Sequence, residues 1–111
     1  MMKPATILLL ALAAFSAAPV QRTFTGTISD DMCAIGGHAR MQMGPTDAEC
    51  TRACVALHGA GYVLISGKSI YVLSGQTTPE QLAGQRVKVV GMLDAKTKTI
   101  RVRSLTAAPR R

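Results

Sequence analysis

The sequence predicts one small, mainly β domain with a helical insertion that contains all of its cysteines. Short apolar runs alternate with turn residues along most of the chain, and one segment carries a complete helix N-terminal signal. Cys33, Cys50 and Cys54 all lie between the first and second expected strands. At 111 residues, the chain has room for one modest core, and small domains of this kind often add a covalent or metal staple.

The first eighteen residues are typical of an export signal. Lys3 provides a positive charge, and residues 5–15 form a run that is apolar except for Thr6 and is followed by small residues. This run is shorter than the roughly 20 residues of a membrane-spanning helix, so a retained membrane helix is the less favoured interpretation. We therefore expect a signal peptide over residues 1–18 and an exported mature protein, periplasmic or secreted. Its domain is expected over residues 22–106, with a disordered tail at 107–111.

The sequence predicts a first strand that is followed by a long loop. Residues 24–28 alternate apolar with polar side chains, which predicts a strand that ends at Ser29, Asp30 and Asp31. Residues 32–45 are rich in glycine and show neither helical nor strand periodicity, so we expect a loop there.

A helix is predicted over residues 47–58. Thr46 and Glu49 match a capping box, and Gly59 is a natural helix stop. At 100° per residue, one stripe of this helix gathers four residues that should face its packing partner: Cys50, Ala53, Cys54 and Leu57.

Residues 62–66 and 69–73 form the clearest hairpin in the sequence. The two-residue turn Gly67-Lys68 sets a register in which Ser66 pairs with Ser69. One face then carries Val63, Ile65, Ile70 and Val72, and the other carries Tyr62, Leu64, Tyr71 and Leu73. Because both faces are apolar, we expect one to line the core and the other to be covered by the helix at 47–58 or by a partner chain.

The remaining elements complete a recognisable order. A helical turn is expected within residues 76–84, followed by strands at 85–93 and 98–105. Their inward residues are Val87, Val89, Ile100 and Val102, and their outer face carries Arg86, Lys88, Arg101 and Arg103, which we interpret as a solvated surface. Five strands with a helical turn between the third and the fourth are the order of an oligonucleotide- and oligosaccharide-binding (OB) barrel. The predicted fold is thus a mainly β, five-stranded OB-like barrel with a helical, cysteine-containing insertion between strands one and two.

Several motifs resemble those of a family of small exported bacterial proteins of unknown function. They are, in chain order, residues 26–33 (GTISDDMC), His38, residues 50–55 in the pattern CTxxCV and residues 59–64 (GAGYVL). The resemblance covers residues 24–105. It implies an OB-like barrel with a Cys/His-containing insertion and an exported location, and it implies no activity.

Metal binding is one chemistry that suits this insertion. Cys33, His38, Cys50 and Cys54 supply the three thiolates and one imidazole of a structural zinc shell. Met41 and Met43, next to His38, would shift the preference toward cuprous copper. The expected cofactor is therefore none, or zinc or copper.

A disulfide is the favoured alternative. Cys33 would pair with Cys54 or with Cys50, because two cysteines four residues apart on one helix are poorly placed to bond each other. Either bond closes a loop of about twenty residues, worth roughly 3 kcal/mol in the chain-entropy model. The third cysteine would then be a buried apolar residue or would link two chains, so the expected state is a monomer or a cysteine-linked dimer.

A thiol-redox protein is the third interpretation, with His38 or His58 beside a free thiol. The spacing Cys-x-x-Cys is absent, and no catalytic signature is present, so we expect an exported, non-enzymatic domain with a binding or envelope-structural role. The net charge of +7 suits an anionic envelope surface as partner. Nucleic acid is not expected as a partner, because aromatic platforms for stacking bases are nearly missing.

Overall fold

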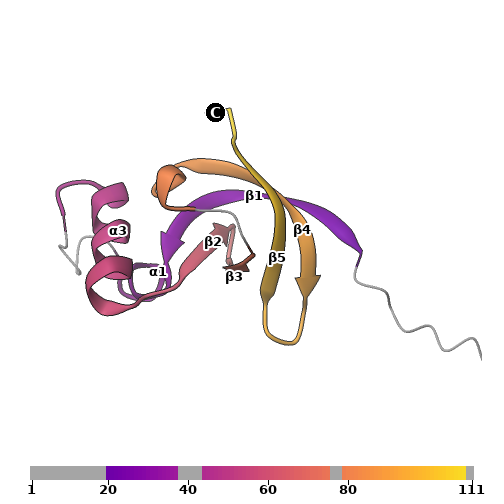
Figure 1. Ribbon diagram of the computed structural model, residues 1–111, viewed down its shortest axis with the longest axis horizontal. Helices are drawn as coiled ribbons and strands as arrows, with labels where there is room; N and C mark the ends of the chain where they lie inside the picture. The colour runs from indigo at the N-terminus through magenta and orange to yellow at the C-terminus, as the bar shows by residue number, and fades with distance from the viewer. Residues whose placement is uncertain (1–19, 38–43, 76–78, 110–111) are drawn as a thin grey trace, which may run out of the picture.

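The computed structural model describes residues 20–37, 44–75 and 79–109 (Figure 1). Within these ranges the chain forms five strands, two α-helices and one 3-10 turn. In chain order they are β1 (Gln21–Asp30), α1 (Asp31–Gly36), α3 (Asp47–His58), β2 (Tyr62–Ser66), β3 (Ser69–Ser74), η1 (Pro79–Leu82), β4 (Arg86–Asp94) and β5 (Thr99–Ala107). The prediction of a mainly β domain with a helical segment between the first two strands is confirmed.

The strands form one mixed sheet. They pair in the order β1-β2-β3-β5-β4, and β4 also pairs with β1. The β3–β5 pair is parallel, and the other pairs are antiparallel. The predicted hairpin register is confirmed, since Ser66 pairs with Ser69.

The main core lies on the inner face of this sheet. Its buried members are Phe24, Ile28, Leu64, Ala83, Val87, Val89, Ile100 and Val102. Of the two apolar hairpin faces, the one with Tyr62, Leu64, Tyr71 and Leu73 packs on this core. On the opposite face Val63 is buried but Val72 is 44% exposed, because α3 packs mainly against β1 and not over the hairpin.

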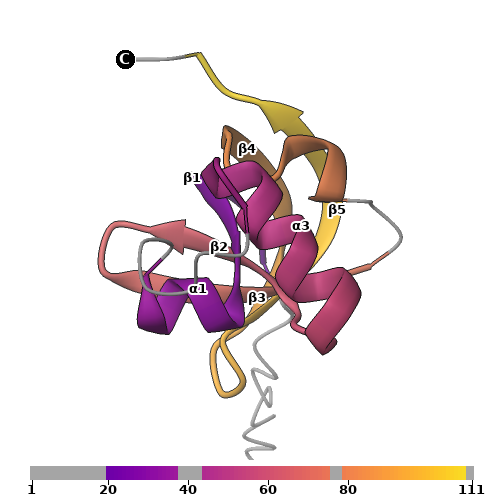
Figure 2. The ribbon, with the colours of Figure 1, turned by 90° about the vertical axis from the view of Figure 1, so that its left-hand side faces the viewer.

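The two helices lie together in front of one end of the sheet, as Figure 2 shows. The helix α3 begins close to the chain that leads into β4. Gly84 makes this approach possible, because its φ is +75° and a Cβ there would come within 2.8 Å of the Ala48 amide nitrogen. Among the described residues, no helix has the length and the apolar character needed to cross a membrane.

Three expectations are wrong in detail. The expected loop at 32–45 instead begins inside a helix, α1, because Asp30 caps that helix with its side chain. Leu57 does not face inward but is 71% exposed. The tail does not begin at Ala107, which is the last residue of β5. The expected signal peptide lies outside the described residues, because residues 1–19 are not described.

Candidate metal centre

The three cysteines come from two helices that are both capped by side chains. Cys33 lies in α1, while Cys50 and Cys54 lie one turn apart in α3. One half of the predicted capping box is present, since the Thr46 hydroxyl oxygen accepts a hydrogen bond from the Glu49 amide at 3.1 Å. The Glu49 carboxylate accepts from the Thr46 hydroxyl at 3.2 Å. At the other end Gly59 adopts the left-handed conformation with φ +67°. These caps fix the start and the end of α3, and with them the direction of its two thiols.

The three sulfur atoms meet at one buried point between the helices. Cys33 Sγ lies 3.3 Å from Cys50 Sγ and 3.6 Å from Cys54 Sγ, and the three sulfur atoms all lie within 4.8 Å of one another. The exposed fractions of Cys33, Cys50 and Cys54 are 2%, 1% and 0%. In a tetrahedral zinc site with Zn–S bonds of about 2.3 Å, neighbouring sulfurs are about 3.8 Å apart. The cluster is therefore close to the spacing that three metal thiolates require.

The sulfur spacing also bears on the favoured disulfide. All three cysteines are free, and their sulfurs are well beyond the S–S bond length of about 2.05 Å. Cys33 is the residue that contacts both helical cysteines, so a disulfide of Cys33 with Cys54 or with Cys50 stays a prediction for the oxidised protein.

The histidines are placed differently from each other. His38 lies outside the described residues, as do Met41 and Met43, so the fourth ligand stays a prediction. His58 lies exposed in the last turn of α3, one helical turn beyond Cys54. The position of His58 needs no ligand role to explain it, because the C-terminal end of a helix favours positively charged side chains.

Asp30 is the residue of this site that the sequence analysis did not find. Its side chain is fully buried, and Oδ2 accepts hydrogen bonds from the Met32 amide at 3.1 Å and the Cys33 amide at 3.0 Å. Asp30 is thus the N-cap of α1 and sets the position of Cys33. The spacing Asp-x-x-Cys was the available signal, because an N-cap aspartate bonds the amide three residues ahead.

Two buried polar atoms near the cluster make no hydrogen bond within the described part of the chain. They are Asp30 Oδ1 and the hydroxyl oxygen of Thr51, which follows Cys50 in α3. The two lie near each other, since Thr51 is one of the groups that lower the pKa of Asp30. The sulfur cluster is therefore bordered on one side by the Asp30 carboxylate and the Thr51 hydroxyl.

This surrounding determines the charge of the metal-free cluster. Burial raises the pKa of Cys33 far above its ordinary value, and the Asp30 carboxylate and the other two thiols add to this effect. Burial likewise raises the pKa of Cys54. Burial also acts to raise the pKa of Asp30, but the polar groups of Cys33, Thr51 and Met32 outweigh it and lower that pKa. The metal-free site thus holds the neutral thiols of Cys33 and Cys54 beside a carboxylate.

We expect the thiols of the reduced, metal-free protein to react slowly with iodoacetamide at pH 7. Each unit by which burial raises a thiol pKa lowers the reactive thiolate about tenfold. The rate should rise on unfolding in urea. In the folded protein the rates of Cys33 and Cys54 should still be increasing with pH above the ordinary thiol pKa of 9.0, near which the rate of the unfolded chain levels off. Mass spectrometry of samples taken over time in the presence of a chelator measures both rates. Equal rates with and without urea at pH 7 would contradict this expectation.

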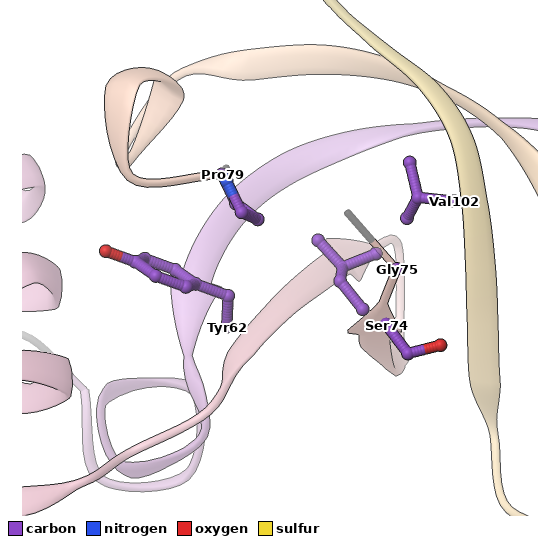
Figure 3. A pocket seen from close by; sticks show the side chains of 6 residues that line it. Tyr62, Ser74, Gly75, Pro79 and Val102 are labelled. Carbon is purple, nitrogen blue, oxygen red and sulfur yellow. The ribbon is translucent and has the colours of Figure 1, made fainter. Parts of the chain in front are cut away.

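A small pocket elsewhere in the molecule has no comparable chemistry. It measures about 210 Å³ and is lined by Tyr62, Leu73, Ser74, Gly75, Pro79 and Val102 (Figure 3). Tyr62 is the only one of these residues that titrates, and its hydroxyl points away from Val102 in Figure 3. The pocket therefore offers apolar walls and a few hydroxyls, but no metal ligands or nucleophile pair.

Comparisons with known proteins found no relative that bears on this site. No family model, no curated protein and no solved structure matches the chain.

Proposed function

We propose that this protein is an exported, non-enzymatic domain whose helical insertion is held together by a soft metal ion, zinc or cuprous copper. Cys33, Cys50 and Cys54 are its thiolate ligands. The observation that carries the proposal is that three buried sulfur atoms from two helices lie close together. Cys33 Sγ lies 3.3 Å from Cys50 Sγ and 3.6 Å from Cys54 Sγ. Soft thiolates select such ions over magnesium or calcium.

The burial of the cluster favours a structural role for the metal. Sites that exchange metal or perform catalysis keep a position open to solvent, whereas structural zinc sites are closed. The second buried cluster of the protein consists of these cysteines and Ala60, with Met32 and Val55 packed against it. A metal at its centre would fasten α1 to α3 where apolar contact area is small.

His38 is the proposed fourth ligand, on the basis of the sequence. It follows Cys33 by five residues and supplies the imidazole that would complete a Cys₃His shell. His58 provides a matched control, because it is the only other histidine of the chain and lies exposed at the end of α3.

We also propose that the sheet is an OB-like barrel. Three features support this assignment: the pairing order, the parallel contact of β3 with β5, and the 3-10 turn η1 between β3 and β4. The helical insertion occupies the connection between β1 and β2.

Two other chemistries compete with the metal. A disulfide between Cys33 and either helical cysteine remains the alternative for an oxidising compartment, since both sulfurs already contact Cys33. A thiol-redox role is less well supported, because a reactive cysteine needs a lowered pKa, whereas burial raises the pKa of Cys33 and Cys54.

Metal analysis of the purified protein separates these proposals. Protein isolated from the periplasm without reductant or added metal is measured by native mass spectrometry and by elemental analysis. We expect about one zinc or copper ion per chain and three thiols that react after denaturation. His38→Ala should lower the metal affinity, and His58→Ala should not. A mass lower by two hydrogen atoms, with no metal, would instead establish the disulfide. Three free thiols with no metal would rule out both the metal and the disulfide.

A further inference from the structure

The charges of this protein are separated along the chain. Five of its six carboxylates lie between residues 30 and 80. Residues 86–103 carry six cations and only one carboxylate, Asp94. The strands β4 and β5 and the turn between them therefore form a strongly basic part of the molecule.

The cations of the two strands point away from the core. Val87, Val89 and Val102 are buried in the core. The cations that alternate with them lie on the other face, where Lys88 and Arg101 are exposed and Arg86 is half-buried. The side chain of Arg103 confirms this direction on β5, because its Nη1 donates to Gln21 Oε1 at 3.1 Å. Since β4 lies between β1 and β5 in the sheet, this hydrogen bond crosses the outer face of β4.

The pairing register arranges four cations in a row. Arg86 and Lys88 lie on β4. On β5, Arg101 pairs with Met92 of β4, and Arg103 is the residue left over at the register shift, because Val102 pairs with Gly91 and Ser104 with Val90. At about 3.4 Å per residue, the six steps from residue 86 to residue 92 make this row about 20 Å long. We call this surface, with the cations Arg86, Lys88, Arg101 and Arg103, the basic face.

Hydroxyl and amide groups surround the row. Their exposed side chains lie on the strands that flank β4, and they are Gln21, Thr23, Thr25, Ser104 and Thr106. The helices pack mainly against β1, β2 and each other, and Figures 1 and 2 show them at the opposite end from the β4–β5 turn. The basic face thus combines a line of cations with neutral hydrogen-bonding groups.

We propose that the basic face binds an acidic polysaccharide, a linear polymer whose carboxylate or sulfate groups alternate with hydroxyls. A row of four cations suits an extended polyanion better than a single small anion, because one anion would meet only one or two of them. The guanidinium groups bind carboxylates and sulfates in a bidentate manner, while the flanking hydroxyls and amide match the hydroxyls of the polymer.

Two other anionic partners fit the same face less well. Binding of single-stranded nucleic acid uses aromatic rings that stack on bases, but the described rings, Phe24, Tyr62 and Tyr71, pack on the core. Insertion into a membrane uses exposed apolar side chains. In the described part of the chain, the large exposed ones are Val20, Ile35, Leu57 and Val72, none of which lies on β4 or β5.

Heparin, a soluble sulfated polysaccharide, is the probe for this proposal. Its affinity for the metal-loaded protein is measured by titration calorimetry at several NaCl concentrations. Arg101→Gln should weaken binding and lower the slope of log affinity against log salt by about one, because one contact that releases a counterion is lost. The control, Arg52→Gln, removes one positive charge from α3. Arg52 donates a hydrogen bond from Nε to the Glu80 carbonyl, and a glutamine side chain can donate to the same carbonyl. This control should leave the slope unchanged.

The comparison of partners completes the test. We expect heparin to bind at least about tenfold more tightly than vesicles that contain anionic phosphatidylglycerol, and than a 20-nucleotide thymidine strand. The double variant Lys88→Gln, Arg101→Gln should lower the slope of log heparin affinity against log salt by about two. Equal losses for Arg52→Gln and Arg101→Gln would show that only net charge matters. Tighter binding of vesicles or of the thymidine strand would overturn the assignment of the polymer. Metal content, measured in the same samples, tests the metal centre separately.

Discussion

Replacing Cys33 by serine is expected to release the metal and to lower the free energy of unfolding by about 4 kcal/mol. This is the stabilisation from a ligand whose free concentration is about 1,000 times its Kd. Cys33 is the ligand to choose because it contacts both other sulfurs and is the only ligand from α1. Without it, α1 contributes no thiolate, and the pair on α3 cannot by itself fasten the two helices. Urea unfolding in the presence of excess zinc measures the loss.

A chelator separates the metal from simple packing. Wild-type protein and the Cys33→Ser variant are unfolded both with zinc and with chelator. We expect the chelator to destabilise the wild type by about the same 4 kcal/mol and to leave the variant nearly unchanged. If the variant stays less stable by the full amount even in chelator, its defect is one of packing and the metal contributes nothing.

Asp30→Ala is expected to cost about 3 kcal/mol in the metal-free protein. Loss of an N-cap costs about 1 kcal/mol, and the buried Cys33 amide is left without an acceptor, which costs about 1–3 kcal/mol more. Asp30→Asn keeps an oxygen at the capping position and should lose less. Because the pKa of Asp30 is lowered, its contribution is present above the ordinary value of 3.8 and disappears as the pH falls through the lowered pKa. Urea unfolding in chelator at pH 7 and at low pH measures both effects.

The neighbouring aspartate provides the control. Asp31 is exposed and accepts one hydrogen bond, from the Gly61 amide at 3.2 Å, so Asp31→Ala should cost less than about 1 kcal/mol. In zinc, Asp30→Ala should also bind metal more weakly, because α1 no longer holds Cys33 in position. Equal effects of the two substitutions would mean that burial and capping at Asp30 are unimportant.

The strands and the long helix could be predicted from local signals. The turn at Gly67-Lys68 fixes the hairpin register, and the alternation around Val87 and Val89 separates core from solvent. Thr46 and Gly59 determine the ends of α3. In each case the signal and the structure it specifies lie within a few residues of each other, so tertiary contacts add little.

The helix α1 and the role of Asp30 could not be predicted in the same way. A helix of six residues is too short to show periodicity, and the glycines after it favour a loop. Asp30 follows a strand directly, where an aspartate ordinarily ends the strand. Leu57 lies on the same stripe as Cys50 and Cys54 but is exposed, because it is close to the end of α3 and beyond the surface on which that helix packs.

The insertion leaves the sheet and returns to it at one place. The Asp31 amide donates to the Gly61 carbonyl at 3.0 Å, the Gly61 amide donates back to the Asp31 carboxylate at 3.2 Å, and next to them Asp30 pairs with Tyr62. The ends of β1 and β2 are thus held together by hydrogen bonds, as they would be by a tight turn, although the insertion between them is long. These contacts at the base of the insertion set the register of β1 and β2 locally, while Asp30 at the end of β1 connects the sheet directly to the cysteine cluster.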